Sequence, residues 1–234
     1  MSAMFASAPV ALKAVDAVDL AEIFALRSFA DPNVLVLYGV LVAGSSDVAT
    51  VAERPDAALD VVLCGNPLPR VDSLRVARDM ASALTFLHSR EVAHLRLAPP
   101  NVLCHRAPHL RCKVADFGLS RECQGSGAMT RVGSVQWAAP EVLLGKCYNH
   151  KCDLWSFGVV CWELLTARVP FDGMNQMSVA TKVAMEGMRL PVPPNCPRRL
   201  LRMIARCWSE QPALRPDFDE MTIELQGIEV SIEE

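Results

Sequence analysis

The chain has 234 residues, of which 51% are hydrophobic, and its mean hydropathy is +0.22. A chain of this length and composition can bury a sizeable core, which excludes an intrinsically disordered protein. The net charge is −3 and no block of basic residues occurs, so we expect neither nucleic acid nor an anionic membrane as a partner.

The first residues contain neither the basic nor the apolar part of a signal peptide, so we expect a soluble cytoplasmic protein. The segment Val10–Lys13 predicts a strand that ends in a lysine. Asp19 and Glu22 have the spacing of a capping box, and the apolar face that follows predicts a helix to about residue 30. Residues 34–42 predict a buried strand and are far too few for a membrane span of roughly 20 residues. Residues 48–53 predict another strand.

Further along, a helix is predicted over residues 71–89, whose apolar residues recur on one face. Residues 101–104 and 112–115 predict a pair of short strands, and residues 153–165 predict a very apolar helix. The 9 cysteines include no Cys-x-x-Cys pair and lie mostly in apolar segments. We therefore expect buried, reduced thiols and predict neither disulfides nor a zinc site.

Three short motifs follow one another in the middle of the chain. They are the segment His94–Asn101 (HLRLAPPN), the segment Asp116–Gly118 (DFG) and the segment Ala139–Glu141 (APE). Their order matches the catalytic loop H-R-D-L-x-x-x-N, the metal-binding D-F-G and the A-P-E of protein kinases. One such motif is a weak signal, but three in order are a strong one, so the chain resembles a protein kinase. Residues 129–134 and 207–218 are similar to the tyrosine-kinase-like group, of the Raf or mixed-lineage type.

This resemblance implies an α+β fold with two lobes. Residues 1–55 would form a reduced, β-rich N-lobe and residues 56–234 a mainly helical C-lobe. The family places two strands and a glycine-rich loop before the lysine that pairs with the phosphates, which Lys13 resembles. The residues before Lys13 include no glycine and are too few for two strands and a turn. We therefore expect a truncated N-lobe that lacks the phosphate-covering loop.

The resemblance also implies where ATP and Mg²⁺ would bind. Asn101 and Asp116 correspond to the metal ligands. The other positions implied to contact the nucleotide are Ala11, Lys13, Glu22, Glu53 and Leu103. Glu22 has two interpretations that the sequence leaves open, because it could pair with Lys13 or simply cap a shortened helix. Glu53, Arg54 and Pro55 would form the hinge, whose backbone meets adenine in the family.

Other matching residues have structural roles in the family. Asp153 would cap the backbone of the catalytic loop. Arg215 is expected to pair with Glu141, although it could instead be an exposed surface residue. His94 and Phe117 would belong to the hydrophobic spine.

The chain departs from the family at the residues that perform catalysis. Arg96 occupies the position of the catalytic aspartate, and an arginine cannot accept a proton. Ala98 stands where Ser/Thr kinases have a lysine, and Leu95 replaces the arginine that pairs with a phosphorylated activation segment. Arg96 is expected near Asp116 and Asn101, where its charge could replace that of a metal, or else it points into solvent.

These departures predict a catalytically impaired kinase-like protein, a pseudokinase, that acts in intracellular signalling by binding an active kinase or a scaffold client. ATP and Mg²⁺ are candidate cofactors. The alternative is an active ATP-dependent Ser/Thr kinase of the tyrosine-kinase-like group. That alternative needs another carboxylate as the base, and none lies beside Arg96 in the sequence. A third interpretation is an incomplete chain whose glycine-rich loop lies upstream.

Overall fold

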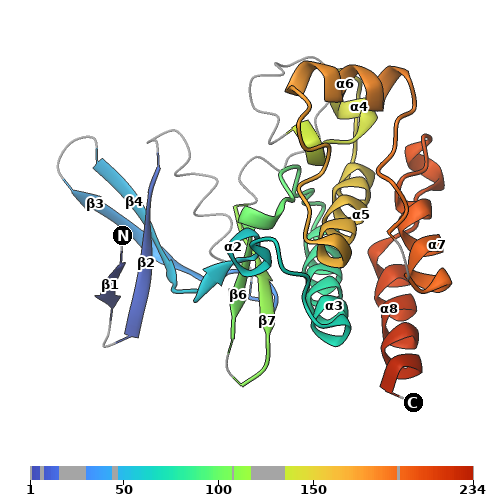
Figure 1. The fold of residues 1–234 in the computed structure, drawn as a ribbon. Helices are drawn as coiled ribbons and strands as arrows, with labels where there is room; N and C mark the ends of the chain where they lie inside the picture. The colour runs from blue at the N-terminus through green and yellow to red at the C-terminus, as the bar shows by residue number, and fades with distance from the viewer. Residues whose placement is uncertain are drawn as a thin grey trace.

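The structure is a computed structural model that describes residues 2–5, 8–15, 30–43, 47–106, 108–116, 135–193 and 196–233. Strands form the N-terminal part of the molecule and helices most of the C-terminal part, and the two parts lie side by side (Figure 1). This arrangement confirms the predicted α+β class. In the described parts of the chain, no helix is long and apolar enough to cross a membrane.

The N-terminal part is a four-stranded antiparallel sheet with the strand order β1-β2-β4-β3. Its strands are β1 (Ser2–Phe5), β2 (Ala8–Val15), β3 (Leu37–Ala43) and β4 (Asp47–Glu53). Lys13 lies on β2, as the sequence predicts. The strand β1 comes before β2 in the sequence and pairs with it.

The prediction of a buried strand over residues 34–42 is wrong in part. Val34 is buried, but it lies outside the sheet and bridges to Val114 of a second sheet. The strand β3 begins only at Leu37, and the side chains of Leu41 and Val42 are exposed. The reason is that β3 is an edge strand whose only partner in the sheet is β4, so a run of apolar residues does not guarantee burial there.

A second, three-stranded antiparallel sheet connects the two parts of the molecule. Its strands are β5 (Ala57–Ala58), β6 (Val102–His105) and β7 (Arg111–Val114). The strands β6 and β7 confirm the predicted strand pair. Backbone hydrogen bonds of Val114 with Asn33 and Leu35, at 2.8 and 3.0 Å, tie this sheet to the segment before β3.

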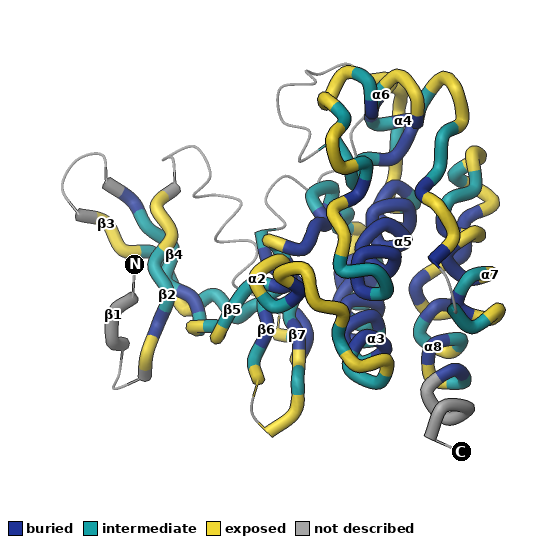
Figure 2. The backbone as a smooth tube through the Cα atoms, viewed as in Figure 1, coloured by how far each residue is buried: buried dark blue, intermediate teal, exposed yellow. Residues whose placement is uncertain are grey.

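The helices pack around α5, which is buried from Cys152 to Leu164. Because α5 is apolar on all sides, it can only be stable when other elements enclose it. Figure 2 shows α5 and the inner side of α3 as the most buried helical segments. The helices are α2 (Leu59–Leu63), α3 (Arg70–His88), α4 (Pro140–Leu143), α5 (Lys151–Thr166), α6 (Gln176–Met185), α7 (Arg198–Cys207) and α8 (Phe218–Glu233).

Single 3₁₀ turns occupy Pro99–Asn101, Val135–Trp137 and Pro212–Leu214. The predicted helices over residues 71–89 and 153–165 correspond to α3 and α5 and are confirmed. The helix predicted up to residue 30 falls on residues 16–29, which lie outside the described parts.

Gly158 allows α5 to approach the C-terminal end of α7 closely. A Cβ atom at this position would lie 2.7 Å from Trp208 Nε1 and 2.9 Å from Cys207 Cβ. Both distances are too short for real Cβ contacts, so a larger residue would force the two helices apart. The glycine is therefore required by packing, although it is a poor helix former.

We predict that Gly158→Ala lowers the free energy of unfolding by up to about 2 kcal/mol, because an overpacking cost of about 1–3 kcal/mol outweighs the roughly 1 kcal/mol gained in helix propensity. Urea unfolding followed by circular dichroism measures this change. Gly227→Ala in α8 is the matched control, since a Cβ there meets only the flexible end of Arg199 at 3.3 Å. Equal stability changes in the two variants would contradict the packing argument.

Candidate active site

The buried carboxylate of Asp153 holds the backbone that enters the candidate active site. Its Oδ2 accepts the amide of His94 at 2.7 Å, and its Oδ1 accepts the amide of Leu95 at 2.8 Å. His88 Nε2 lies 2.8 Å from the same Oδ2. Burial alone would raise the pKa of Asp153, but the hydrogen bond and charge of His88 outweigh it and lower this pKa. The predicted cap of the loop by Asp153 is confirmed.

Leu95 adopts a left-handed backbone conformation with a φ of 64°. This conformation is costly for a residue with a side chain and persists only where the surroundings impose it. The hydrogen bond from the Leu95 amide to Asp153 supplies part of that constraint.

His94 connects this loop to the end of β7. It is fully buried, and its Nε2 lies 3.0 Å from the carbonyl oxygen of Ala115, while the amide of Arg96 lies 3.1 Å from its Nδ1. A carbonyl only accepts and an amide only donates, so the proton is on Nε2 and the ring is neutral. Burial lowers the pKa of His94, which agrees with the neutral form.

Arg96 lies beside both Asn101 and Asp116, as the sequence predicts, rather than in solvent alone. Its carbonyl oxygen accepts a hydrogen bond of 2.7 Å from Asn101 Nδ2. Its Nη1 lies 3.3 Å from Asp116 Oδ2. The guanidinium of Arg96 therefore neutralises one oxygen of the carboxylate that would hold a metal in a kinase.

The other oxygen of Asp116 is also occupied, because Oδ1 pairs with Lys13 Nζ. Burial alone would raise the pKa of Asp116, but the hydrogen bond and charge of Lys13 and the charge of Arg96 outweigh it and lower this pKa. We call Lys13, Asp116 and Arg96 the Asp116 triad. It joins residues from β2, from the end of β7 and from the loop that Asp153 holds.

Glu53, at the end of β4, is held within the fold by its side chain. Its Oε1 accepts hydrogen bonds from Lys113 Nζ at 2.6 Å and from the amide of Val36 at 2.7 Å. Sequence reasoning missed the ion pair with Lys113, and no spacing signal reveals a partner 60 residues away. Of the other positions predicted to contact nucleotide, Ala11 lies on β2 and Leu103 on β6, both half-buried.

The predicted hinge offers few backbone donors. The amide of Glu53 donates to the carbonyl of Val36 at 3.1 Å, and the amide of Asp56 donates to that of Cys104 at 3.0 Å. Pro55 has no N–H. Among residues 53–56, Arg54 therefore remains as the backbone donor not committed in this way.

The sequence matches a family model described as protein tyrosine and serine/threonine kinase over residues 8–225. This chain belongs to that family. It is 41% identical over 162 residues to the serine/threonine/tyrosine-protein kinase HT1 of Arabidopsis thaliana, a match that covers 69% of this chain and 41% of the relative. It is 31% identical over 221 residues to human mitogen-activated protein kinase kinase kinase 11, covering 91% of this chain and 26% of the relative.

A probable serine/threonine-protein kinase of Dictyostelium discoideum is 33% identical over 211 residues, covering 86% of this chain and 16% of the relative. The chain thus spans less than half the length of each of these relatives. The predicted likeness to the tyrosine-kinase-like group is confirmed by homologues of that group. The family and the fold are established by these matches.

Kinases of this family use ATP and Mg²⁺, and the Asp116 triad does not fit the metal. Mg²⁺ needs anionic or neutral oxygen ligands at 2.0–2.1 Å in nearly octahedral geometry. Both oxygens of Asp116 instead face cationic nitrogens.

A catalytic lysine and a regulatory arginine of the family are both absent from the described loop. Ala98 is buried and ends in a methyl group where Ser/Thr kinases have a lysine. Leu95 is half-buried and apolar where the family has an arginine that pairs with phosphate. Glu22, Phe117 and residues 129–134 lie outside the described residues, so both interpretations of Glu22 remain open.

The pairing of Arg215 with Glu141 is confirmed. Its Nη1 and Nη2 donate to the two carboxylate oxygens at 2.6 and 2.8 Å, and the side chain of Arg215 is fully buried. The interpretation of Arg215 as an exposed surface residue is wrong. This bidentate pair joins Glu141 on α4 to Arg215, which lies between the 3₁₀ turn Pro212–Leu214 and α8.

Glu163 is a buried acid that the sequence gives no reason to single out. It lies on α5, and its Oε2 accepts a hydrogen bond of 2.7 Å from Trp137 Nε1. Burial raises the pKa of Glu163 to about 8. The contact fixes Trp137, at the end of the activation segment, to the central helix.

The thiols follow the sequence prediction only in part. Among the described cysteines, the buried ones are Cys104, Cys112, Cys152, Cys161 and Cys207. Cys64 and Cys147 are exposed, because each lies in a surface segment that follows a short helix, α2 or α4.

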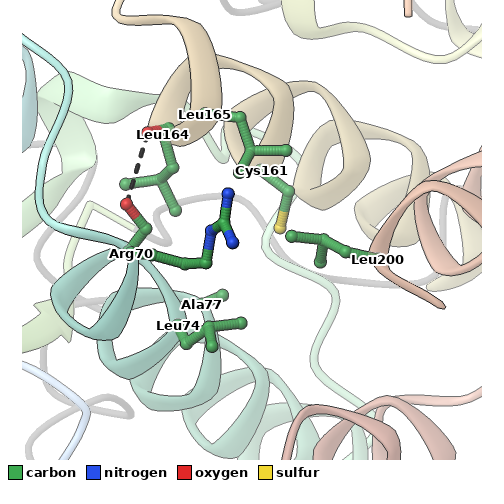
Figure 3. Close-up of a pocket in the computed structure, with 8 residues that line it drawn as sticks. Arg70, Leu74, Ala77, Cys161, Leu164, Leu165 and Leu200 are labelled. Atoms are coloured by element: carbon green, nitrogen blue, oxygen red, sulfur yellow. Dashed lines mark hydrogen bonds between the residues drawn. The ribbon is translucent and has the colours of Figure 1, made fainter. Parts of the chain in front are cut away.

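A small, largely apolar pocket lies between α3, α5 and α7, at the opposite end of α5 from Asp153 (Figure 3). The side chain of Arg70 extends into it, and Cys161 and Leu200 line its far wall. Burial raises the pKa of the Cys161 thiol, so this thiol is protonated and unreactive. The pocket is separate from the Asp116 triad and belongs to the packing of the helices.

We predict that the contribution of Glu163 to the stability of the protein falls as the pH rises from about 4.5 to about 8. Over this range the carboxyl group of Glu163 keeps its proton in the folded state and has lost it in the unfolded state. Unfolding therefore releases a proton and becomes more favourable as the pH rises. Glu163→Gln keeps an acceptor for Trp137 and removes this effect. Its stability advantage over the wild type should grow with pH by an amount on the order of a few kcal/mol.

Urea unfolding at several pH values across this range measures the difference. The exposed Glu186→Gln is the control, because it removes an acid from the surface of the same molecule. Parallel pH dependences for the wild type and Glu163→Gln would contradict the prediction.

Proposed function

We propose that this chain is a catalytically impaired kinase-like domain, a pseudokinase, that acts in cytoplasmic signalling by binding an active kinase or a scaffold client. The observation that carries the proposal is the guanidinium of Arg96, which occupies the position of the catalytic base and pairs with Asp116 at 3.3 Å. A guanidinium stays protonated at any physiological pH, so it cannot accept the proton of a substrate hydroxyl.

The expected loss of rate is large. A positioned general base contributes about 10²–10⁴-fold to a rate, and Arg96 also places a positive charge where the hydroxyl must approach. Ala98 removes a second cation that would lie near the transferred phosphate. Such losses do not add simply, because the groups act together, but each of them acts against phosphoryl transfer.

The parts of the molecule that hold the fold together support a binding role. Asp153 still anchors the loop, and Arg215 still pairs with Glu141. A chain that retains these buried interactions keeps the internal framework of a kinase while it lacks the catalytic base. In this proposal residues 1–55 and 56–234 form the two lobes.

In this proposal the phosphates of a nucleotide would lie near Lys13, Asn101 and Asp116. The adenine would lie nearer Ala11, Glu53 and Leu103. Glu22 is a further candidate for contact with the nucleotide. Lys13 is the most exposed member of the Asp116 triad, with 61% of its side chain accessible, so it can contact a bound ligand. Leu103 and Ala11 lie on strands on either side of the segment that joins the two parts of the molecule.

An active Ser/Thr kinase is the second candidate function. The names of the relatives favour it, because they are those of serine/threonine-protein kinases and related enzymes. It requires a carboxylate other than Asp116 to act as the base. The triad counts against it, since the carboxylate of Asp116 is already neutralised by two cations.

The test is transfer of labelled phosphate from ATP to a generic protein substrate and to the chain itself, with Mg²⁺ or Mn²⁺ present. We expect the wild type to remain at background. Arg96→Asp restores a carboxylate and is the variant expected to raise the rate. Arg168→Asp is the matched control, because Arg168 is exposed just beyond the opposite end of α5.

Transfer by the wild type that disappears in Lys13→Met would contradict the proposal and establish the active kinase instead. An increase in Arg168→Asp equal to that in Arg96→Asp would show that the effect is one of overall charge.

A further inference from the structure

The Asp116 triad is built as an anion site rather than a cation site. One carboxylate, 22% exposed, is bracketed by two cations whose side chains are 61% and 39% exposed. The two positive groups therefore extend toward solvent while the negative group lies beneath them. The net charge of the three groups is positive, which favours an anionic ligand.

Arg96 is fixed where it stands by its own backbone. Its amide donates to His94 Nδ1, and its carbonyl accepts from Asn101 Nδ2. These two hydrogen bonds place the start of the side chain next to Asp116. The guanidinium cannot lose its charge, so a divalent cation that approaches Asp116 meets a permanent positive charge beside its ligand.

We infer that the Asp116 triad binds the polyphosphate of a nucleotide without Mg²⁺, and that Arg96 supplies the positive charge that a metal supplies in active kinases. This inference rests on the proposed function, since a site that lacks the metal would bind a nucleotide without transferring phosphate. Arginine suits this role because its planar fork of donors matches phosphate oxygens.

The hinge indicates that the protein recognises a nucleotide mainly through its phosphates rather than through its purine ring. The amides of Glu53 and Asp56 are committed to carbonyls of the fold, and Pro55 has none. A purine ring bound at the hinge would find few backbone donors. ATP, GTP and inorganic tripolyphosphate should therefore bind with similar affinities.

The experiment is isothermal titration calorimetry of the wild-type chain with ATP, GTP and inorganic tripolyphosphate, each in excess EDTA and in excess MgCl₂. We expect all three probes to bind in EDTA. Mg²⁺ should weaken binding or leave it unchanged, because it chelates the polyphosphate and competes with the triad. Tighter binding in MgCl₂ would overturn the inference, as would the absence of binding in EDTA by the folded protein.

Two substitutions of Arg96 sharpen the test. Arg96→Ala should weaken binding in EDTA by about tenfold or more, the effect of losing a hydrogen bond to a charged group. Arg96→Asp should reverse the response, so that Mg²⁺ strengthens ATP binding. An unchanged affinity in Arg96→Ala, or an unchanged Mg²⁺ response in Arg96→Asp, would overturn the inference.

Arg168→Ala is the matched control, since it removes the same charge far from the triad and should bind as the wild type does. Unfolding curves of each variant establish that it is folded before it is titrated. The outcomes separate the two proposals. Mg²⁺-strengthened binding without phosphate transfer removes only the inference about the metal, whereas phosphate transfer by the wild type removes the proposed function.

Discussion

The carboxylate of Asp153 is the interaction on which the candidate active site depends. It is fully buried at the start of the apolar helix α5, and it binds two consecutive amides of the loop at 2.7 and 2.8 Å. A buried carboxylate without such donors would be very costly, so the loop and the helix stabilise each other. His94 extends this connection to Ala115, next to Asp116. The backbone that a kinase uses to place its catalytic groups is therefore intact.

This intact backbone is what makes the substitution at position 96 informative. The loop brings whatever residue stands there close to Asp116, because both the amide and the carbonyl of that residue are held. With an aspartate at this position, a second carboxylate would lie near Asp116, and only Lys13 would neutralise Asp116. With Arg96, two cations of the chain neutralise Asp116 from both sides. We therefore propose that this one change of residue type makes the site unfavourable for a metal.

Motifs and periodicity in the sequence predicted secondary structure and the contacts of motif residues, but not the other long-range contacts between side chains. The strand of Lys13, the helices α3 and α5, the cap by Asp153 and the pair of Glu141 with Arg215 were all predicted, because each is tied to a motif. The exposure of β3 was not, since burial of an apolar strand depends on its neighbours. The bonds of Glu53 with Lys113 and of Glu163 with Trp137 join residues far apart in the chain and leave no local pattern. That Arg96 contacts Asp116 was one of two open interpretations, because the sequence places a residue but not its side chain.

The central claim is that Arg96 and Asp116 interact directly, and a double-mutant cycle tests it. The free energy of unfolding is measured at low salt for the wild type, Arg96→Ala, Asp116→Ala and the double variant. Because both side chains are partly exposed, we expect a coupling energy of about 0.5–1 kcal/mol, which should shrink in high salt. Stability changes that simply add, within about 0.3 kcal/mol, would show that the two side chains do not interact and would contradict the account.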